Sequence, residues 1–181
     1  MKATGIVRRI DELGRVVIPK EIRRTLRIKE GAPLEIFTDR DEHMLKKYSP
    51  IATLDRFSKA TARSLNDLSG KLTVICDTDG VLHAVGEGRK ELDGKGLSEE
   101  MDQILKERRS YIANASEGGD ILPLTEMGEE GVTAQVIVPI IAGGDCFGAV
   151  AVLSKEDGAK MDDREMNLAR LTAEILANQF E

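Results

Sequence analysis

The sequence has few of the residues from which enzymes usually build catalytic sites. It contains no tryptophan, two tyrosines and four phenylalanines, so a pocket lined by aromatic rings is not expected. Its two histidines are His43 and His83, and neither has a nucleophile or a carboxylate at a spacing typical of catalysis. We expect structural or surface roles for both histidines, no catalytic residues and no enzymatic activity.

Cysteines are also scarce, and both lie among apolar residues. No Cys-x-x-Cys or Cys/His spacing surrounds Cys76 or Cys146, so the sequence predicts neither a disulfide nor a metal site. Free cysteines in apolar segments usually behave as small core residues. We therefore expect two reduced, buried cysteines, with no metal and no cofactor.

Long apolar segments are absent as well. The longest apolar stretches lie near Val136–Ala142 and Phe147–Leu153, and both are far shorter than the ~20 residues that span a bilayer. The first residues, Met1–Gly5, lack the apolar core of a secretory signal. We expect a cytoplasmic protein with no membrane partner.

An excess of positive charge is confined to the beginning of the chain, although the whole sequence has a formal net charge of −6. Residues 1–48 contain 12 Lys and Arg against 8 Asp and Glu, whereas residues 49–181 contain 14 against 24. Within residues 1–29 the count is 9 basic against 3 acidic. Because only this basic part attracts a polyanion, we expect two modules with different partners.

A proline marks the boundary between the two modules. Ser49-Pro50 ends the first one, because proline cannot continue a strand ladder. The apolar residues of 51–69 then repeat with a helical period, which predicts an amphipathic connecting helix. We expect an N-terminal domain over residues 1–50, the connecting helix over 51–69 and a C-terminal domain over 70–181.

The N-terminal module is predicted to consist of short strands around one short helix. The strands cover 4–10 and 15–18, the helix covers 19–26, and a hairpin joins 33–38 to 44–48. A module of this size buries too little apolar surface to be stable alone without disulfides or metals. We therefore expect it to form a dimer.

The C-terminal module alternates hairpins and helices. Its predicted elements are a hairpin (72–76 with 81–85), a helix (98–111), a second hairpin (132–141 with 147–154) and a last helix (162–180). Glu165 follows Asp162 at the spacing of a capping box, which favours a helix start there. This order predicts an α+β fold, an antiparallel sheet with flanking helices.

The last predicted helix carries more apolar surface than a helix on a sheet needs. Its apolar residues cover more than half of its circumference, whereas a stripe of about 100° suffices. We expect it to pack also against the helix at 51–69, in the same or a neighbouring chain, and to add a subunit contact. The alternative is a single well-buried helix inside its own domain.

Arginines dominate the basic segment. The cluster consists of Arg8, Arg15, Lys20, Arg23, Arg24 and Arg27. The last four repeat at helical spacing along the predicted helix, with Ile22 and Leu26 on the opposite side. Guanidinium groups donate paired hydrogen bonds to phosphate, and few carboxylates in this segment can pair with them. The cluster favours nucleic-acid binding over the alternative of a merely solvated cationic surface.

The same segment resembles a known family. Residues 11–26, Asp-Glu-Leu-Gly-Arg-Val-Val-Ile-Pro-Lys-Glu-Ile-Arg-Arg-Thr-Leu, with Thr4–Arg8 before them and Leu34–Phe37 after them, resemble the AbrB-type transition-state regulator domain. That family folds as an intertwined dimer in which swapped hairpins form one small β-barrel. The resemblance implies double-stranded DNA as the partner, recognised mainly through phosphate contacts and DNA shape. It places the DNA contacts on Arg8, Arg15, Arg23 and Arg24, and with less weight on Arg9, Lys20 and Arg27.

The C-terminal module is similar to a GAF domain. Residues 144–153, Gly-Asp-Cys-Phe-Gly-Ala-Val-Ala-Val-Leu, resemble the penultimate strand and turn of that family. GAF domains often bind a small molecule, but the sequence has no chromophore-bearing cysteine or cyclic-nucleotide motif that would identify one. The glycine-rich run 86–89 lacks the strand-loop-helix frame of a phosphate loop, so we interpret it as a surface loop.

The combination of the two modules resembles a family of sporulation transcription regulators. Its members are tetramers in endospore-forming bacteria that activate or repress late forespore genes. The resemblance implies a nucleoid-associated protein that dimerises through its N-terminal domain and forms tetramers through C-terminal helices. Two alternatives stay open. One is an AbrB/MazE-type antitoxin with a disordered C-terminal segment, and the other is a metabolite sensor whose DNA binding is secondary.

Overall fold

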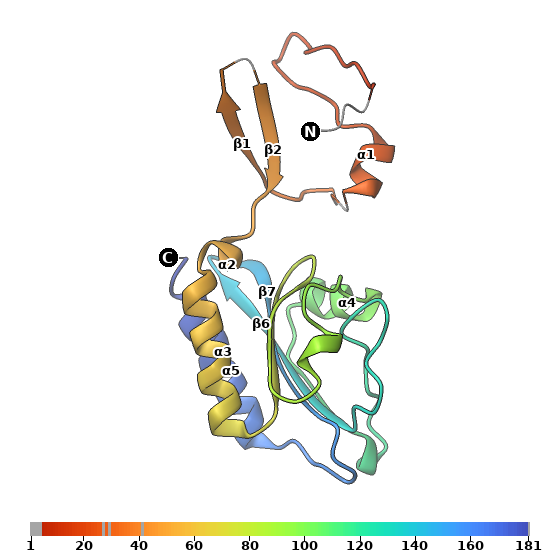
Figure 1. The fold of residues 1–181 in the computed structure, drawn as a ribbon, viewed down its shortest axis with the longest axis vertical. Coiled ribbons are helices and arrows are strands. Elements are labelled where there is room, and N and C mark those ends of the chain that lie inside the picture. Colours follow the sequence, from red (N-terminus) through yellow and green to blue (C-terminus); the bar gives the residue numbers. More distant parts are fainter. Residues whose placement is uncertain (1–4, 27, 29, 41, 181) are drawn as a thin grey trace. The chain divides into compact units, whose positions relative to one another are not determined.

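The chain forms two compact units, Met1–Tyr48 and Ser49–Glu181 (Figure 1). The computed structural model describes residues 5–26, 28, 30–40 and 42–180. The first unit contains helix α1 (Lys20–Thr25) and an antiparallel hairpin of strands β1 (Leu34–Asp39) and β2 (Glu42–Lys47). The helix and the hairpin lie where the sequence predicts them.

The two strands predicted at 4–10 and 15–18 are not formed. Thr4 lies outside the described residues, and residues 5–18 contain irregular backbone and a turn but no strand. The prediction was wrong for a single chain. An alternating pattern of apolar residues indicates which side chains need burial, but a strand also needs a neighbouring strand to pair with, and the pattern does not provide one. A two-chain barrel would supply that neighbour, so the swapped-hairpin barrel stays a prediction.

The N-terminal unit has no core of its own. None of its described residues is buried. Its large apolar side chains are instead exposed, among them Val7 at 85%, Val17 at 70% and Ile36 at 66%. Exposed apolar surface of this kind is typical of a face that another chain covers.

The C-terminal unit is built on a five-stranded antiparallel sheet with the strand order β4-β3-β7-β6-β5. The strands are β3 (Leu72–Asp77), β4 (Val81–Val85), β5 (Tyr111–Asn114), β6 (Ala134–Ala142) and β7 (Asp145–Ser154). The hairpins β3-β4 and β6-β7 follow the two predicted hairpins. Pairing of β3 with β7 joins them into one sheet, with Ile75 opposite Val150.

Helices cover both faces of this sheet (Figure 1). Helices α3 (Asp55–Ser69) and α5 (Asp163–Ala177) pack on one face, and α4 (Glu99–Glu107) packs on the other. Successive residues of β7 alternate between the two cores: Val150 and Val152 face α3 and α5, whereas Ala149 and Ala151 face α4. Both faces are therefore buried, and the predicted α+β fold is confirmed.

The predicted connecting helix is broken into two. Helix α2 (Pro50–Thr53) begins after Ser49, whose Oγ accepts a hydrogen bond from the Ala52 N–H at 3.3 Å. The chain turns at Leu54 before α3 begins, and α3 ends at Gly70 in a left-handed conformation (φ 67°). The periodic pattern of 51–69 predicted the helical face but not this turn.

Helix α3 packs against α5 in the same chain, as predicted. The two helices nevertheless keep apolar side chains exposed: Phe57 at 38% and Leu68 at 61% on α3, and Leu171 at 55% and Ile175 at 39% on α5. Part of the apolar surplus of the last helix is therefore not covered within the described chain.

The second predicted helix ends earlier than expected. Ser98 caps α4 by accepting a hydrogen bond from the Met101 N–H at 3.1 Å. The helix stops at Arg108 in a left-handed conformation (φ 53°), and the residues from Tyr111 form edge strand β5. Pairing of Tyr111 with Ile137 of β6 thus overrides the local helical pattern.

The predicted capping box of the last helix is confirmed, whereas the prediction of two buried cysteines holds for Cys76 only. Asp162 and Glu165 form both hydrogen bonds of the capping box of α5. Cys76 is buried, Cys146 is half-buried, and both are free thiols. Short 3-10 helices η1 (Arg89–Glu91) and η2 (Ala115–Glu117) lie in the loops. None of the described helices is long and apolar enough to cross a membrane.

Candidate nucleic-acid interface

Asp11 organises the turn that precedes α1. Its Oδ1 accepts hydrogen bonds from the backbone N–H groups of Leu13 (3.0 Å) and Arg15 (2.7 Å), and the Asp11 carbonyl accepts one from Gly14 (3.0 Å). Gly14 adopts φ 75°, which a side chain would disfavour. A carboxylate that bonds to its own turn in this way is typical of Asx turns.

The same carboxylate holds the Arg15 side chain. Asp11 Oδ2 accepts a hydrogen bond from Arg15 Nε at 2.9 Å, and the Arg15 side chain stays 69% exposed. The hydrogen bonds from the Arg15 backbone and then from its side chain lower the pKa of Asp11 below its ordinary value. Because the contact uses Nε, no described residue binds the two terminal nitrogens of this exposed guanidinium.

Helix α1 carries the next basic residues. Pro19 occupies its N-cap position, and Lys20 and Arg24 are exposed. Arg23 was predicted on the same basic side as Lys20 and Arg24, but it is half-buried, and its Nε is a buried donor with no hydrogen-bond partner among the described residues. The chain folds back after the helix at this point, where the Ile28 N–H donates to the Arg23 carbonyl at 2.7 Å.

The other predicted DNA contacts lie apart from these elements or outside the described residues. Arg8 and Arg9 are both exposed on the extended segment before the Asp11 turn. No side-chain ion pair or hydrogen bond to another described residue involves Arg8, Arg9, Lys20 or Arg24. Arg27 lies outside the described residues. The structure thus joins Arg15 to the turn and places Arg23 and Arg24 on one helix.

Sequence analysis missed the role of Asp11. The signal was present, because an Asp three residues before a Gly is a common pattern for a turn closed by a side chain. An acidic residue thus fixes the side chain of one of the predicted DNA-binding arginines.

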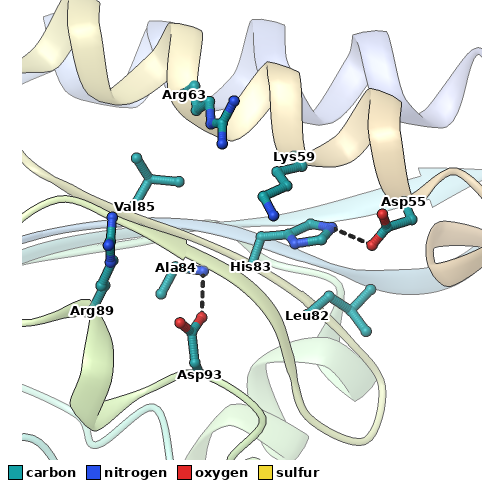
Figure 2. Close-up of a pocket in the computed structure, with 9 residues that line it drawn as sticks. All are labelled: Asp55, Lys59, Arg63, Leu82, His83, Ala84, Val85, Arg89 and Asp93. Carbon is teal, nitrogen blue, oxygen red and sulfur yellow. Dashed lines mark hydrogen bonds and ion pairs between the residues drawn. The ribbon is translucent and has the colours of Figure 1, made fainter.

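The C-terminal unit contains a polar cavity of about 460 Å³ between α3 and β4. Figure 2 shows its lining, with Asp55, Lys59 and Arg63 of α3 facing His83 of β4 across the opening, and Arg89 on the far side. We refer to this cavity as the α3–β4 pocket. The glycine-rich run 86–89 is a surface turn, as predicted, but its last residue, Arg89, also lines this pocket.

His83 is the most buried polar side chain described in the pocket wall. Its side chain is 10% exposed, and its Nε2 lies 3.0 Å from Ser58 Oγ and 3.5 Å from Asp55 Oδ1. Burial lowers the pKa of His83 below its ordinary value, and the nearby Asp55 carboxylate only partly opposes this effect. The predicted structural role of His83 agrees with these contacts.

Comparison with known protein families covers nearly the whole chain. Residues 53–181 match the family described as "Stage V sporulation protein T C-terminal, transcription factor". Residues 7–53 match the family described as "Antidote-toxin recognition MazE, bacterial antitoxin".

Two characterised relatives come from Bacillus subtilis (strain 168). The chain is 45% identical to stage V sporulation protein T over 182 aligned positions, which cover 100% of this chain and 99% of the relative. It is 44% identical to the transition state regulatory protein AbrB over 92 positions, covering 51% of this chain and 94% of that protein.

Solved structures resemble the C-terminal unit in fold. A methyl-accepting chemotaxis protein fragment, residues 122 to 287, gives a TM-score of 0.60 at 18% identity and covers 71% of this chain and 89% of that one. The GAF domain of an Acinetobacter phosphoenolpyruvate-protein phosphotransferase gives a TM-score of 0.56 at 14% identity, covering 69% and 80%. These likenesses show a GAF-like fold for this unit.

The antitoxin alternative predicted a disordered C-terminal segment, whereas residues 49–180 form a packed sheet with helices on both faces. The relative that matches from end to end is a sporulation protein. An AbrB-type N-terminal unit followed by a GAF-like C-terminal unit accounts for the whole chain. The protein belongs to the stage V sporulation protein T family of transcription factors.

Proposed function

We propose that this protein binds double-stranded DNA and both activates and represses late sporulation genes. It acts on the nucleoid in the forespore cytoplasm and catalyses no reaction. The observation that carries this proposal is the Asp11 turn, which holds an exposed Arg15 in the segment that precedes the basic helix α1. The end-to-end similarity to stage V sporulation protein T supports it.

The arginines of the N-terminal unit are proposed to contact the phosphate backbone. The best-supported contacts are Arg15, held by Asp11, and Arg24, exposed on α1. Arg23 has a buried Nε donor that lacks a partner among the described residues, and leaving such a donor unpaired costs about 1–3 kcal/mol. A phosphate oxygen would satisfy a donor of this kind. The full proposed set is Arg8, Arg15, Arg23 and Arg24, with smaller contributions from Arg9, Lys20 and Arg27.

The DNA-binding unit is proposed to be a dimer. Val7, Val17 and Ile36 are exposed in a unit that buries none of its described residues. The AbrB-type fold would bury such side chains in a barrel formed by hairpins from two chains. Dimerisation would also double the number of arginines that face one DNA duplex.

The C-terminal units are proposed to join two such dimers into a tetramer. The exposed apolar side chains of α3 and α5, Leu68 and Leu171 above all, provide a surface for a second copy. In this scheme residues 1–50 bind DNA, residues 51–69 connect the two domains and contribute α3 to the subunit contact, and residues 70–181 provide the rest of that contact. The GAF-like fold and the α3–β4 pocket support a further role in sensing a small molecule.

Fluorescence anisotropy with a labelled duplex tests the DNA-binding proposal. Hydrogen bonds to charged groups contribute about 1.5–3 kcal/mol each, so Arg15→Gln/Arg24→Gln should weaken binding about 100-fold or more. The control, Arg56→Gln/Arg170→Gln, removes the same charge from exposed positions of the C-terminal unit. Equal affinities of the two variants would refute the assignment of the DNA-binding surface.

A further inference from the structure

The α3–β4 pocket has a surplus of unpaired positive charge. Lys59, Arg63 and Arg89 line it, and none of them forms a side-chain ion pair or hydrogen bond with another described residue. Figure 2 shows the three cationic groups around the opening, coming from helix α3 and from the turn after β4. Cations gathered from two elements around one cavity attract a negatively charged ligand.

The two acidic residues of the pocket contact other groups than the three cations. Asp93 Oδ1 accepts a hydrogen bond from the backbone N–H of Ala84 at 3.1 Å, which ties the loop after η1 to β4. Asp55 Oδ1 lies 3.5 Å from His83 Nε2 on the opposite wall. Neither carboxylate forms an ion pair with the three cations, so their charge remains available to a ligand.

The volume of the pocket and the residues that line it indicate which class of ligand it can bind. A volume of about 460 Å³ falls within the range of about 300–1,000 Å³ that is usual for small-molecule sites and exceeds the need of a single phosphate ion. Leu82 and Val85 add apolar surface beside the cations. Two arginines and a lysine suit several anionic groups on one organic molecule, because guanidinium forks bind phosphate or carboxylate through paired hydrogen bonds.

We propose that the α3–β4 pocket binds a small organic molecule with two or more anionic groups, either phosphate or carboxylate. The site deepens, and rests on, the sensing role proposed for the C-terminal unit, and it does not depend on the DNA contacts. Helix α3, which supplies Lys59 and Arg63, also packs against α5, so a ligand here would contact an element of the proposed subunit interface.

Isothermal titration calorimetry on the full-length protein tests this site, with pyrophosphate and citrate as probes at fixed ionic strength. The wild type should bind at least one of them with one site per chain. Tighter binding of pyrophosphate indicates a phosphate-bearing ligand, and tighter binding of citrate indicates a polycarboxylate. Absence of binding of either probe to the wild type overturns the proposal.

Matched variants locate the binding. Lys59→Gln/Arg63→Gln/Arg89→Gln should weaken probe binding about tenfold or more, because each lost cation removes charge-assisted hydrogen bonds. The control Arg56→Gln/Lys106→Gln/Arg170→Gln changes the net charge equally at exposed positions outside the pocket and should bind like the wild type. Equal weakening in both triple variants overturns the proposal.

Two further measurements separate this site from the DNA-binding surface. Arg15→Gln/Arg24→Gln should keep probe binding, and its loss would place the probe on the N-terminal unit and overturn the proposal. In NMR titrations, a bound anion should raise the pKa of His83 towards its ordinary value, because a nearby negative charge favours the protonated ring. His43 serves as an internal reference, and an unchanged His83 titration would contradict binding in this pocket.

Discussion

Replacing Gly148 by alanine should strongly destabilise the C-terminal unit. Gly148 lies in β7 opposite Asp77 of β3, and its φ is 156°. An added Cβ would overlap the carbonyl group of Cys76 and the Cα of Asp77. These are backbone atoms in the middle of the sheet, so they cannot move aside as a flexible side chain would.

The magnitude follows from two costs. Overpacking a well-packed core costs about 1–3 kcal/mol, and a positive φ at a residue with a Cβ costs about 1–2 kcal/mol. The free energy of unfolding should therefore fall by about 2–5 kcal/mol. For a unit of this size, 1 kcal/mol corresponds to roughly 3–4 °C in Tm, so the Tm should drop by roughly 6–20 °C.

Thermal unfolding followed by circular dichroism measures this effect, and Gly143→Ala provides the control. Gly143 also has a positive φ, 56°, but a Cβ there meets nothing within 4 Å. It should lose only about 1–2 kcal/mol, the cost of the backbone conformation. Equal losses of Tm in the two variants would refute the close approach of β3 and β7 at Gly148.

Three further results are expected. As the pH falls below 6.5, the ordinary pKa of histidine, the free energy of unfolding should decrease, because burial lowers the pKa of folded His83 and the unfolded chain takes up the proton first. Urea titrations from neutral to mildly acidic pH measure this free energy. His83→Gln should abolish its decrease at acidic pH, and His43→Gln should retain it. A decrease that His83→Gln retains and His43→Gln abolishes would contradict the role of His83. Burial raises the pKa of Cys76 to about 12, so a thiol reagent should label it only after unfolding, and rapid labelling of native Cys76 would show that the core is open. Leu171→Glu should dissociate the proposed tetramer in sedimentation experiments, whereas Arg170→Gln, which changes the net charge equally at an exposed position about 100° around α5, should not; an intact tetramer in both variants would exclude the face around Leu171.

Local chemistry explains which parts of the fold could be predicted from the sequence. The turn between β3 and β4 was predictable because the Asp77 carboxylate accepts hydrogen bonds from Asp79 (2.8 Å) and Gly80 (2.9 Å), as expected of an Asp-x-x-Gly turn. The start of α5 was predictable for the same reason, because Asp162 and Glu165 satisfy each other's backbone donors. In both cases the residues that decide the structure lie within a few positions of each other.

Features that depend on distant contacts could not be predicted. The residues from Tyr111 form β5 because Ile137 of β6 lies beside them, and no local pattern indicates that pairing. The N-terminal strands lacked a neighbour in the single chain for the same reason. The functional residues show the same difference. The sequence indicated Arg15 and Arg24 as DNA contacts. It did not indicate the half-burial of Arg23 or the position of Arg89 in the α3–β4 pocket, because both depend on the folded chain around these residues.

The salt dependence of DNA binding measures how many phosphates the arginines of the N-terminal unit contact. Each phosphate contact contributes about 0.9 to the slope of log K against log salt concentration. Arg15→Gln/Arg23→Gln/Arg24→Gln should therefore flatten the slope by about 2.7 for each bound subunit, and by about 5.4 for a dimer. The account predicts this flattening on every duplex sequence, with no change for the control Arg56→Gln/Lys106→Gln/Arg170→Gln. An unchanged slope in the Arg15, Arg23 and Arg24 variant would contradict it.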